Sequence, residues 1–151
     1  MKQKLPEPML HAFAEAQAAA KRGEVPVGAV IVDANGTIIA KAGNQTLELK
    51  DPTAHAEILA IRSAAKNLNS ERLIDCDLYV TLEPCAMCAA AISFARIRRV
   101  YFAAEDEKMG AVENGPRFFN QPTCHHAPEI YSGIGETVAK TILKDFFKSR
   151  R

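Results

Sequence analysis

The segment LYVTLEPCAMCAAAISF, residues 78–94, decides the fold of this chain. Its first five residues are predicted to form a short apolar strand. Glu83 and Pro84 end this strand, and Pro84 is suited to the first turn of a helix that we predict to run to about Phe94. Residues 99–104 are predicted to form another strand. A strand, a helix and a second strand in succession indicate an α/β protein.

The flanking sequence continues this alternation. We expect helices over about residues 7–21, 53–66 and 136–148, strands over 25–32, 37–42 and 129–134, and a loop with one helical turn over 105–128. Residues 25–32 are β-branched and nearly all apolar, as in a strand covered on both faces. Thr53 is the predicted N-cap of the second helix. Two apolar stripes are expected to be buried: Ile58, Ile61 and Ala65, and near the C-terminus Val138, Ile142 and Phe146. We therefore predict one three-layer α/β/α domain over residues 1–151, with a central mixed five-stranded sheet.

Composition narrows the class of protein. Apolar residues make up 48% of the 151 residues and charged residues 25%, the balance of a folded domain. No apolar run approaches the ~18 residues of a membrane span, and the start at Met1-Lys2-Gln3-Lys4 is unlike a signal-peptide core. We expect a cytoplasmic protein that does not enter a membrane. The net charge of +1 does not by itself indicate nucleic-acid binding. The basic C-terminal tail either contacts phosphates or is the solvated end of a helix.

Two short motifs carry metal chemistry. The first is Thr53-Ala54-His55-Ala56-Glu57, and the second is Glu83-Pro84-Cys85-Ala86-Met87-Cys88, each at a predicted helix start. The i, i+3 spacing puts both sulfurs on one helical face, where the helix N-terminus favours thiolate. An open zinc site needs three protein ligands and a water, so His55, Cys85 and Cys88 are the predicted ligands of one Zn²⁺ per chain.

Glu57 gives this predicted site its chemistry. Zinc lowers the pKa of a bound water toward ~7, but a deamination also needs a proton on the ring nitrogen and on the departing amine. A carboxylate two residues from His55 is placed to move that proton, a contribution of order 10²–10⁴ in rate. The alternative is a closed zinc site whose fourth ligand is one of four residues: Cys76, Cys124, His125 or His126. A thioredoxin-like redox site would leave His55 and Glu57 unexplained.

At these residues the chain resembles the zinc-dependent nucleobase deaminases, and most closely the bacterial tRNA adenosine deaminases. The pattern His-x-Glu … Pro-Cys-x-x-Cys is the established signature of these zinc deaminases, and the resemblance rests on that known signature. The likeness covers nearly the whole chain, and the segments that carry it are residues 24–30, 51–57, 78–85 and 145–147. It implies a cytidine-deaminase-like fold, a zinc cofactor, a tRNA anticodon loop as partner and a homodimer.

The resemblance also implies roles for individual residues. His55, Cys85 and Cys88 would hold zinc, with Glu57 as the proton shuttle. The implied substrate-binding residues are Asn44 at the purine edge, Val27 and Gly28 in the pocket wall, the backbone N–H of Ala56, Pro84, and Asp106 near the nucleotide backbone. Asn44 as a loop cap, Val27 as a core residue and Asp106 as an ordinary loop acid remain open alternatives.

The chain departs from the family pattern in places that affect the substrate. Glu105 stands where some members carry an arginine, and an acid there would repel phosphate. Residues 123–126 also differ, and His125 and His126 are open to RNA contact or to a plain loop role. The main hypothesis is deamination of the wobble adenosine of tRNA to inosine. The alternatives are a deaminase of a free base or nucleoside such as guanine or cytidine, and a non-catalytic, zinc-stabilised RNA-binding subunit.

Overall fold

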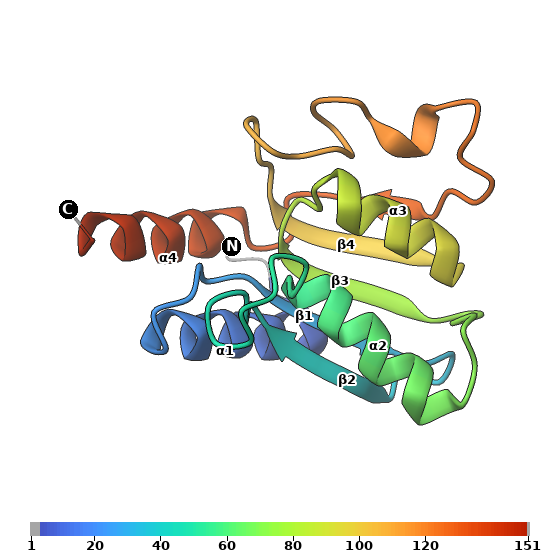
Figure 1. Cartoon of the computed structure of the whole chain (residues 1–151), viewed down its shortest axis with the longest axis horizontal. Coiled ribbons are helices and arrows are strands. Elements are labelled where there is room, and N and C mark those ends of the chain that lie inside the picture. Colours follow the sequence, from blue (N-terminus) through green and yellow to red (C-terminus); the bar gives the residue numbers. More distant parts are fainter. Residues whose placement is uncertain (1–3, 151) are drawn as a thin grey trace.

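A computed structural model describes residues 4–150, and within them five strands form one mixed sheet (Figure 1). The strands are β1 (Gly28–Val32), β2 (Ile38–Gly43), β3 (Asp77–Leu82), β4 (Arg99–Ala104) and β5 (Glu129–Tyr131). Their order across the sheet is β2-β1-β3-β4-β5. β1 is antiparallel to both of its neighbours, whereas β3, β4 and β5 are parallel to one another.

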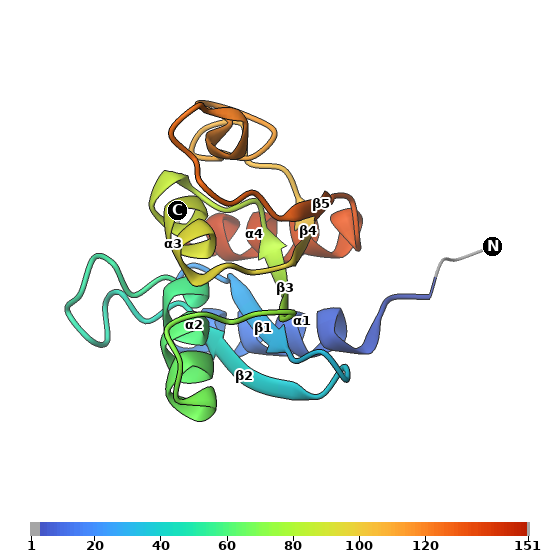
Figure 2. The same ribbon diagram turned by 90° about the vertical axis from the view of Figure 1, so that its right-hand side faces the viewer.

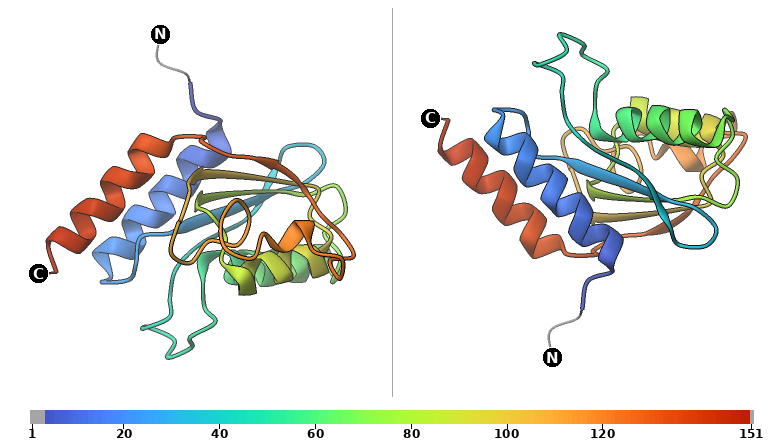
Figure 3. Two further views of the ribbon diagram at one scale, coloured as in Figure 1. Left: turned by 90° about the horizontal axis from the view of Figure 1, so that it is seen from above. Right: turned by 90° about the horizontal axis from the view of Figure 1, so that it is seen from below.

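Four α-helices cover the two faces of this sheet: α1 (Glu7–Lys21), α2 (Ala56–Leu68), α3 (Ala86–Ala95) and α4 (Glu136–Lys148), and a 3₁₀ turn, η1 (Phe118–Asn120), lies in the long loop. α2 and α3 lie side by side on one face, and α1 and α4 on the other (Figures 2 and 3). Each face has its own apolar core. The predicted three-layer α/β/α fold with a mixed five-stranded sheet is confirmed.

The strand directions bring the start of β1 and the ends of β2, β3 and β4 to the same end of the sheet. Gly43 pairs with Gly28 between β2 and β1, and Leu82 pairs with Ala104 between β3 and β4. Because β1 runs against its neighbours, its beginning lies beside the ends of β2, β3 and β4. The residues just beyond those ends therefore meet at this end of the sheet.

Gly28 allows α1 to pack directly on β1. A Cβ on this residue would overlap the backbone carbonyl of Ala12 in α1. All five residues of β1 are buried, as the uninterrupted apolar pattern predicted. Gly28 also donates its backbone N–H to Thr81 Oγ1 at 3.1 Å, which ties β1 to β3.

Both site helices begin later than predicted. Asp51 Oδ1 accepts hydrogen bonds from the N–H and hydroxyl of Thr53, so residues 51–54 form a separate turn and His55, not Thr53, is the N-cap of α2. Likewise Cys85 is the N-cap of α3. Pro84 lies outside that helix, because its carbonyl accepts the N–H of Ala111.

Four further predictions need correction. Val27 donates its N–H to the carbonyl of Val25, a tight turn that delays the first strand until Gly28. In α2 the predicted stripe is only partly buried, because small alanines at 56, 60 and 64 face the sheet. In α4, Val138 is 41% exposed and Ala139 is the buried residue, with Ile142 and Phe146 half-buried. The last strand ends at Tyr131 instead of residue 134.

Two predictions, on the polar start of the chain and on its basic tail, include residues at the two ends of the sequence. Met1 to Gln3 and Arg151 lie outside the described residues. Between residues 4 and 150, no helix combines the length and apolar character that a bilayer crossing requires.

Candidate metal centre and substrate cavity

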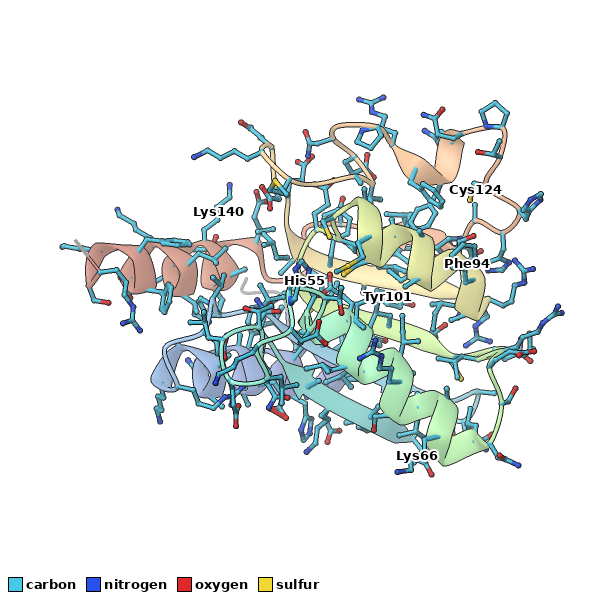
Figure 4. The ribbon with its side chains drawn as sticks, in the orientation of Figure 1. His55, Lys66, Phe94, Tyr101, Cys124 and Lys140 are labelled. Atoms are coloured by element: carbon cyan, nitrogen blue, oxygen red, sulfur yellow. The ribbon has the colours of Figure 1, made fainter. Side chains whose placement is uncertain are left out.

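The N-termini of α2 and α3 converge near His55 (Figure 4). His55 is the N-cap of α2, Cys85 is the N-cap of α3, and Cys88 lies in the first turn of α3. His55 Nδ1 lies 3.5 Å from Cys88 Sγ and 3.7 Å from Cys85 Sγ. The three ligand atoms lie within 4.8 Å of one another, and among residues 4–150 theirs is the one such cluster. The structure thus brings together all three predicted ligands.

These distances fit a tetrahedral zinc ion. Zn–S bonds of about 2.3 Å and Zn–N bonds of about 2.05 Å at the tetrahedral angle separate sulfur from nitrogen by about 3.6 Å. Two thiolates and an imidazole are also ligand types that zinc prefers. The donor set and its spacing therefore fit zinc.

The hydrogen bonds within the cluster favour the thiolate form of Cys85. The hydrogen bond from Cys88, with a further one from His55, lowers the pKa of the Cys85 thiol to about 4. The same contact with Cys85, together with burial, raises the pKa of Cys88. Hydrogen bonding to Cys85 raises the pKa of His55. Cys85 is therefore held as a thiolate, the form that binds metal.

Glu57 lies in the first turn of α2 and is only 4% exposed. Its charged neighbours are the Cys85 sulfur and the His55 ring, and the Cys88 thiol lies within hydrogen-bonding reach. Burial raises the pKa of Glu57 to about 7. A carboxyl group with a pKa near neutrality can both accept and release a proton at physiological pH.

A cavity of about 240 Å³ opens onto this cluster. Its lining includes six residues of the predicted site: Val27, Asn44, His55, Glu57, Cys85 and, from the loop after β4, Asp106. Met109, Thr46, Leu82, Val25 and Glu83 complete the wall. A larger cavity of about 540 Å³ lies next to it, along α4, and shares Val25, Leu82, Asp106 and Met109 with it.

Asn44 follows β2 and is held against α2. Its Oδ1 accepts the backbone N–H of Ala56 at 2.9 Å, and its own N–H donates to the carbonyl of Val27 at 3.2 Å. Among residues 4–150 its Nδ2 group has no hydrogen-bond acceptor, and the side chain lines the cavity. The N–H of Ala56, expected to face the substrate, is used in this internal contact.

The other three predicted substrate residues make contacts within the protein. Gly28 faces α1, and Pro84 uses its carbonyl to bind the loop after β4. Asp106 lines the cavity, but its Oδ1 accepts the N–H groups of Lys108 and Met109, so it also shapes its own loop.

The candidates for a fourth protein ligand lie elsewhere. Cys124 Sγ lies 3.6 Å from Ser93 Oγ, at the far end of α3 from His55 (Figure 4). His126 Nε2 contacts the carbonyl of Ile97 at 2.7 Å, and His125 is exposed. Cys76 is buried beside β3. Within residues 4–150 none of them joins the cluster, so the geometry favours an open metal site.

Two buried carboxylates that bind the loops around the cavity escaped the sequence analysis. Glu24 is 1% exposed and accepts the N–H groups of Leu47 and Glu48 in the loop after β2. Glu83 is 3% exposed and binds the loop after β4. The available signal was a single acid flanked by apolar residues, since such acids are rarely buried unless they are hydrogen-bonded.

Comparison with known proteins agrees with this site. Residues 2–104 match the family described as the cytidine and deoxycytidylate deaminase zinc-binding region. The chain is 61% identical over 140 residues to a tRNA-specific adenosine deaminase of Agrobacterium fabrum, covering 93% of this chain and 91% of that protein.

Two solved structures extend the comparison. One, from a study of A-to-I editing by tRNA:A34 deaminases at the wobble position of transfer RNA, is 61% identical with a TM-score of 0.89 and covers 90% of this chain and 98% of its own. A guanine deaminase from Bacillus subtilis is 36% identical with a TM-score of 0.64 and covers 82% of each chain. The chain therefore belongs to the tRNA-specific adenosine deaminases, within the cytidine and deoxycytidylate deaminase family.

Proposed function

We propose that this protein hydrolytically deaminates adenosine to inosine at the wobble position of a tRNA anticodon. The observation that carries the proposal is the meeting of a His55–Cys85–Cys88 cluster and a buried Glu57 at one cavity, in a chain so similar to proteins named for this activity. The reaction consumes water and releases ammonia.

In this proposal His55, Cys85 and Cys88 hold one Zn²⁺ per chain. The spacing of the three ligand atoms and the match to a zinc-binding family region support it. When bound, zinc supplies a Lewis acid that lowers the pKa of the attacking water. The test is metal analysis of the purified protein: about one zinc per chain is expected, and loss of zinc in Cys85→Ala but not in Cys124→Ala.

Glu57 is the proposed general acid and base. Its carboxylate takes a proton from the attacking water and delivers it to the ring nitrogen beside the attacked carbon. It then assists departure of the amine as ammonia. Burial of Glu57 beside the ligand cluster supports this role, because both protons must move within one enclosed site.

The remaining predicted residues bind the base. The free Nδ2 group of Asn44 is suited to an acceptor on the purine edge. Val27 forms an apolar wall, and Asp106 lines the cavity where the sugar or nucleotide backbone would lie. Ala56 acts through its bond to Asn44, while Gly28 and Pro84 support the wall from behind.

An RNA substrate is supported by the shape of the surface. The cavity of about 240 Å³ has room for a base, and the adjoining cavity of about 540 Å³ offers space for its neighbours. A splayed anticodon loop, with the target base pushed into the pocket, matches such an arrangement. Glu105, which departs from the family pattern, uses its carboxylate within the loop: Oε1 accepts a hydrogen bond from Asn114 Nδ2 at 3.3 Å.

Deamination of free guanine is the second candidate, favoured by the 36% identity to a guanine deaminase. A small substrate makes no phosphate contacts, so its kcat/KM should be insensitive to salt, whereas RNA binding weakens steeply with salt.

The deciding experiment presents the zinc-loaded protein with a tRNA stem-loop carrying a wobble adenosine, and separately with guanine and cytidine, at several salt concentrations. Inosine formation that declines with salt is expected. Turnover of a free base with no inosine would refute the proposal.

A homodimer in the cytoplasm completes the proposal. On α3, Ile92 is buried against the sheet, whereas Phe94 is 74% exposed and supports contact with a second chain. Sedimentation should give a dimer, and a monomer at micromolar concentration would contradict it. A fluorescent fusion should distribute through the cytoplasm, and enrichment at a membrane would refute that placement.

A further inference from the structure

Glu83 accepts five hydrogen bonds from a single segment of the chain. Its Oε1 accepts the N–H of Asp106 at 3.0 Å and Asn114 Nδ2 at 2.7 Å. Its Oε2 accepts the N–H groups of Val112, Glu113 and Asn114 at 2.9 to 3.1 Å. Every donor belongs to residues 105–114, which we name the rim loop.

The carboxylate of Glu83 is buried but charged. Burial acts to raise its pKa, and the hydrogen bonds from Asp106, Asn114 and the loop amides outweigh that effect, so the pKa of Glu83 is lowered. Among residues 4–150 no Lys or Arg forms an ion pair with it. Hydrogen bonds to a charged acceptor are about twice as strong as neutral ones. The N–H donors of the rim loop therefore stabilise the charge of Glu83 in place of a cation.

The rim loop connects the metal cluster to the substrate cavity. It carries Asp106 and Met109, which line the cavity. It is also joined to the segment that contains Cys85: Gly110 forms a bridge with Cys85, and Ala111 donates its N–H to the carbonyl of Pro84. A shift of this loop would therefore move the cavity wall relative to the metal ligands.

Gly110 lets the loop approach the carboxylate closely. A Cβ on Gly110 would lie 2.4 Å from the carbonyl oxygen of Asp106 in the same loop and 2.5 Å from Glu83 Oε2, distances that real Cβ contacts do not reach. The contact can consequently be disrupted from either partner, by changing the acid or by adding one methyl group to the loop.

We propose that Glu83 is a positioning residue that holds the rim loop against the Cys85 segment, so that Asp106 and Met109 are fixed in the cavity wall before the substrate binds. The substrate side of this inference rests on the proposed function. Glu83 acts through the loop, because both of its oxygens are already occupied by loop donors.

The test compares Glu83→Gln and Gly110→Ala with a matched control, Asp77→Asn. Glutamine keeps the shape of Glu83 but turns an N–H₂ group toward N–H donors. Asp77 lies at the other end of β3, is similarly buried at 5% exposed, and accepts two hydrogen bonds from Arg98 at 3.0 Å. Its loss weakens the fold without touching the rim loop.

Two readouts are needed at a temperature where all variants are folded. Hydrogen–deuterium exchange should accelerate at the amides of residues 106 and 112–114 in both rim-loop variants, and not in Asp77→Asn. Because the loop contacts substrate and not the transferred proton, KM for the RNA stem-loop should rise by about tenfold or more while kcat changes little. Zinc content should equal that of the parent.

Parent-like KM in both rim-loop variants, or an equal rise in Asp77→Asn, would overturn the inference, as would loss of zinc in Glu83→Gln. If Glu83→Gln does not fold, Gly110→Ala still decides. If the parent itself shows no RNA deamination, the proposed function fails, while the exchange data still tell whether Glu83 holds the rim loop.

Discussion

Asn44 Oδ1 accepts the backbone N–H of Ala56 at 2.9 Å, and this bond joins the end of β2 to the first turn of α2. The neighbours of Ala56 are His55 and Glu57, so the Asn44 side chain is bonded to the backbone between a metal-cluster residue and the buried carboxyl group, and it lines the same cavity as both. Asn44 thereby has a structural contact through its oxygen and a proposed substrate contact through its nitrogen.

The two halves of the Asn44 amide can be separated by substitution. Asn44→Ala leaves the N–H of Ala56 without its acceptor, which costs about 1–3 kcal/mol in a buried position. Asn44→Asp keeps an acceptor oxygen but removes the Nδ2 donor. Denaturation should show the Asp variant to be more stable than the Ala variant, and kinetics should show both to have lost activity. Full activity of Asn44→Asp would exclude the Nδ2 contact.

Glu57→Gln isolates the proton shuttle from the metal site. The amide is isosteric but cannot carry the proton, so kcat should fall by about 10²–10⁴. Zinc content and the melting temperature should stay at parent values, because Glu57 is not among the three clustered ligands. Glu71→Gln, an exposed acid away from the cavity, is the control. If cells kept full function with Glu57→Gln, a non-catalytic RNA-binding role would be the better account.

Gly28→Ala tests whether this glycine serves packing. The added Cβ overlaps the carbonyl of Ala12, and overpacking of this kind costs about 1–3 kcal/mol. Gly36 at the hairpin turn is the comparison: it has φ +80°, but nothing lies within 4 Å of an added Cβ. Urea denaturation should show a larger loss of stability at Gly28 than at Gly36. Equal losses would mean that α1 is not held as closely as the structure indicates.

Much of the fold followed from local pattern. Residues 99–104 and 136–148 form the predicted strand and helix, and the apolar run of β1 is buried throughout. The starts of α2 and α3 did not follow, because an Asx turn at Asp51 and the carbonyl contact of Pro84 are side-chain and tertiary features. On α4, Val138 was predicted to be buried but is exposed, because the packing of this helix on β4 and α1 determines which of its faces is buried.

The site was predictable to the extent that its chemistry is encoded in short motifs. His55, Cys85 and Cys88 meet as their spacing indicated, with Glu57 beside them. Glu83 stood inside one of those motifs and its role still went unnoticed. Its partners lie 23 to 31 residues further on, in a loop without periodicity, so no local pattern connects them.

The tyrosine pair across β3 and β4 predicts an alkaline limit to stability. Tyr79 and Tyr101 stack with ring centroids 4.4 Å apart. Burial, with a smaller effect of Tyr101, raises the pKa of Tyr79 to about 12. In the unfolded chain the same group ionises near pH 10.

The contribution of Tyr79 to stability is therefore complete below pH 10 and is lost as pH rises through 12. The free energy of unfolding of the parent should fall over this range more steeply than that of Tyr79→Phe. Parallel curves for the two proteins would contradict the assignment.

The central claim is that Glu57 and the His55–Cys85–Cys88 cluster direct a water molecule onto a tRNA adenosine. The most direct measurement is mass spectrometry of a tRNA with a wobble adenosine, after incubation with the zinc-loaded protein in ¹⁸O-labelled water. The account predicts inosine at the wobble position, with one solvent ¹⁸O in its base and an equal amount of ammonia released. Absence of inosine, or inosine without the label, would contradict it.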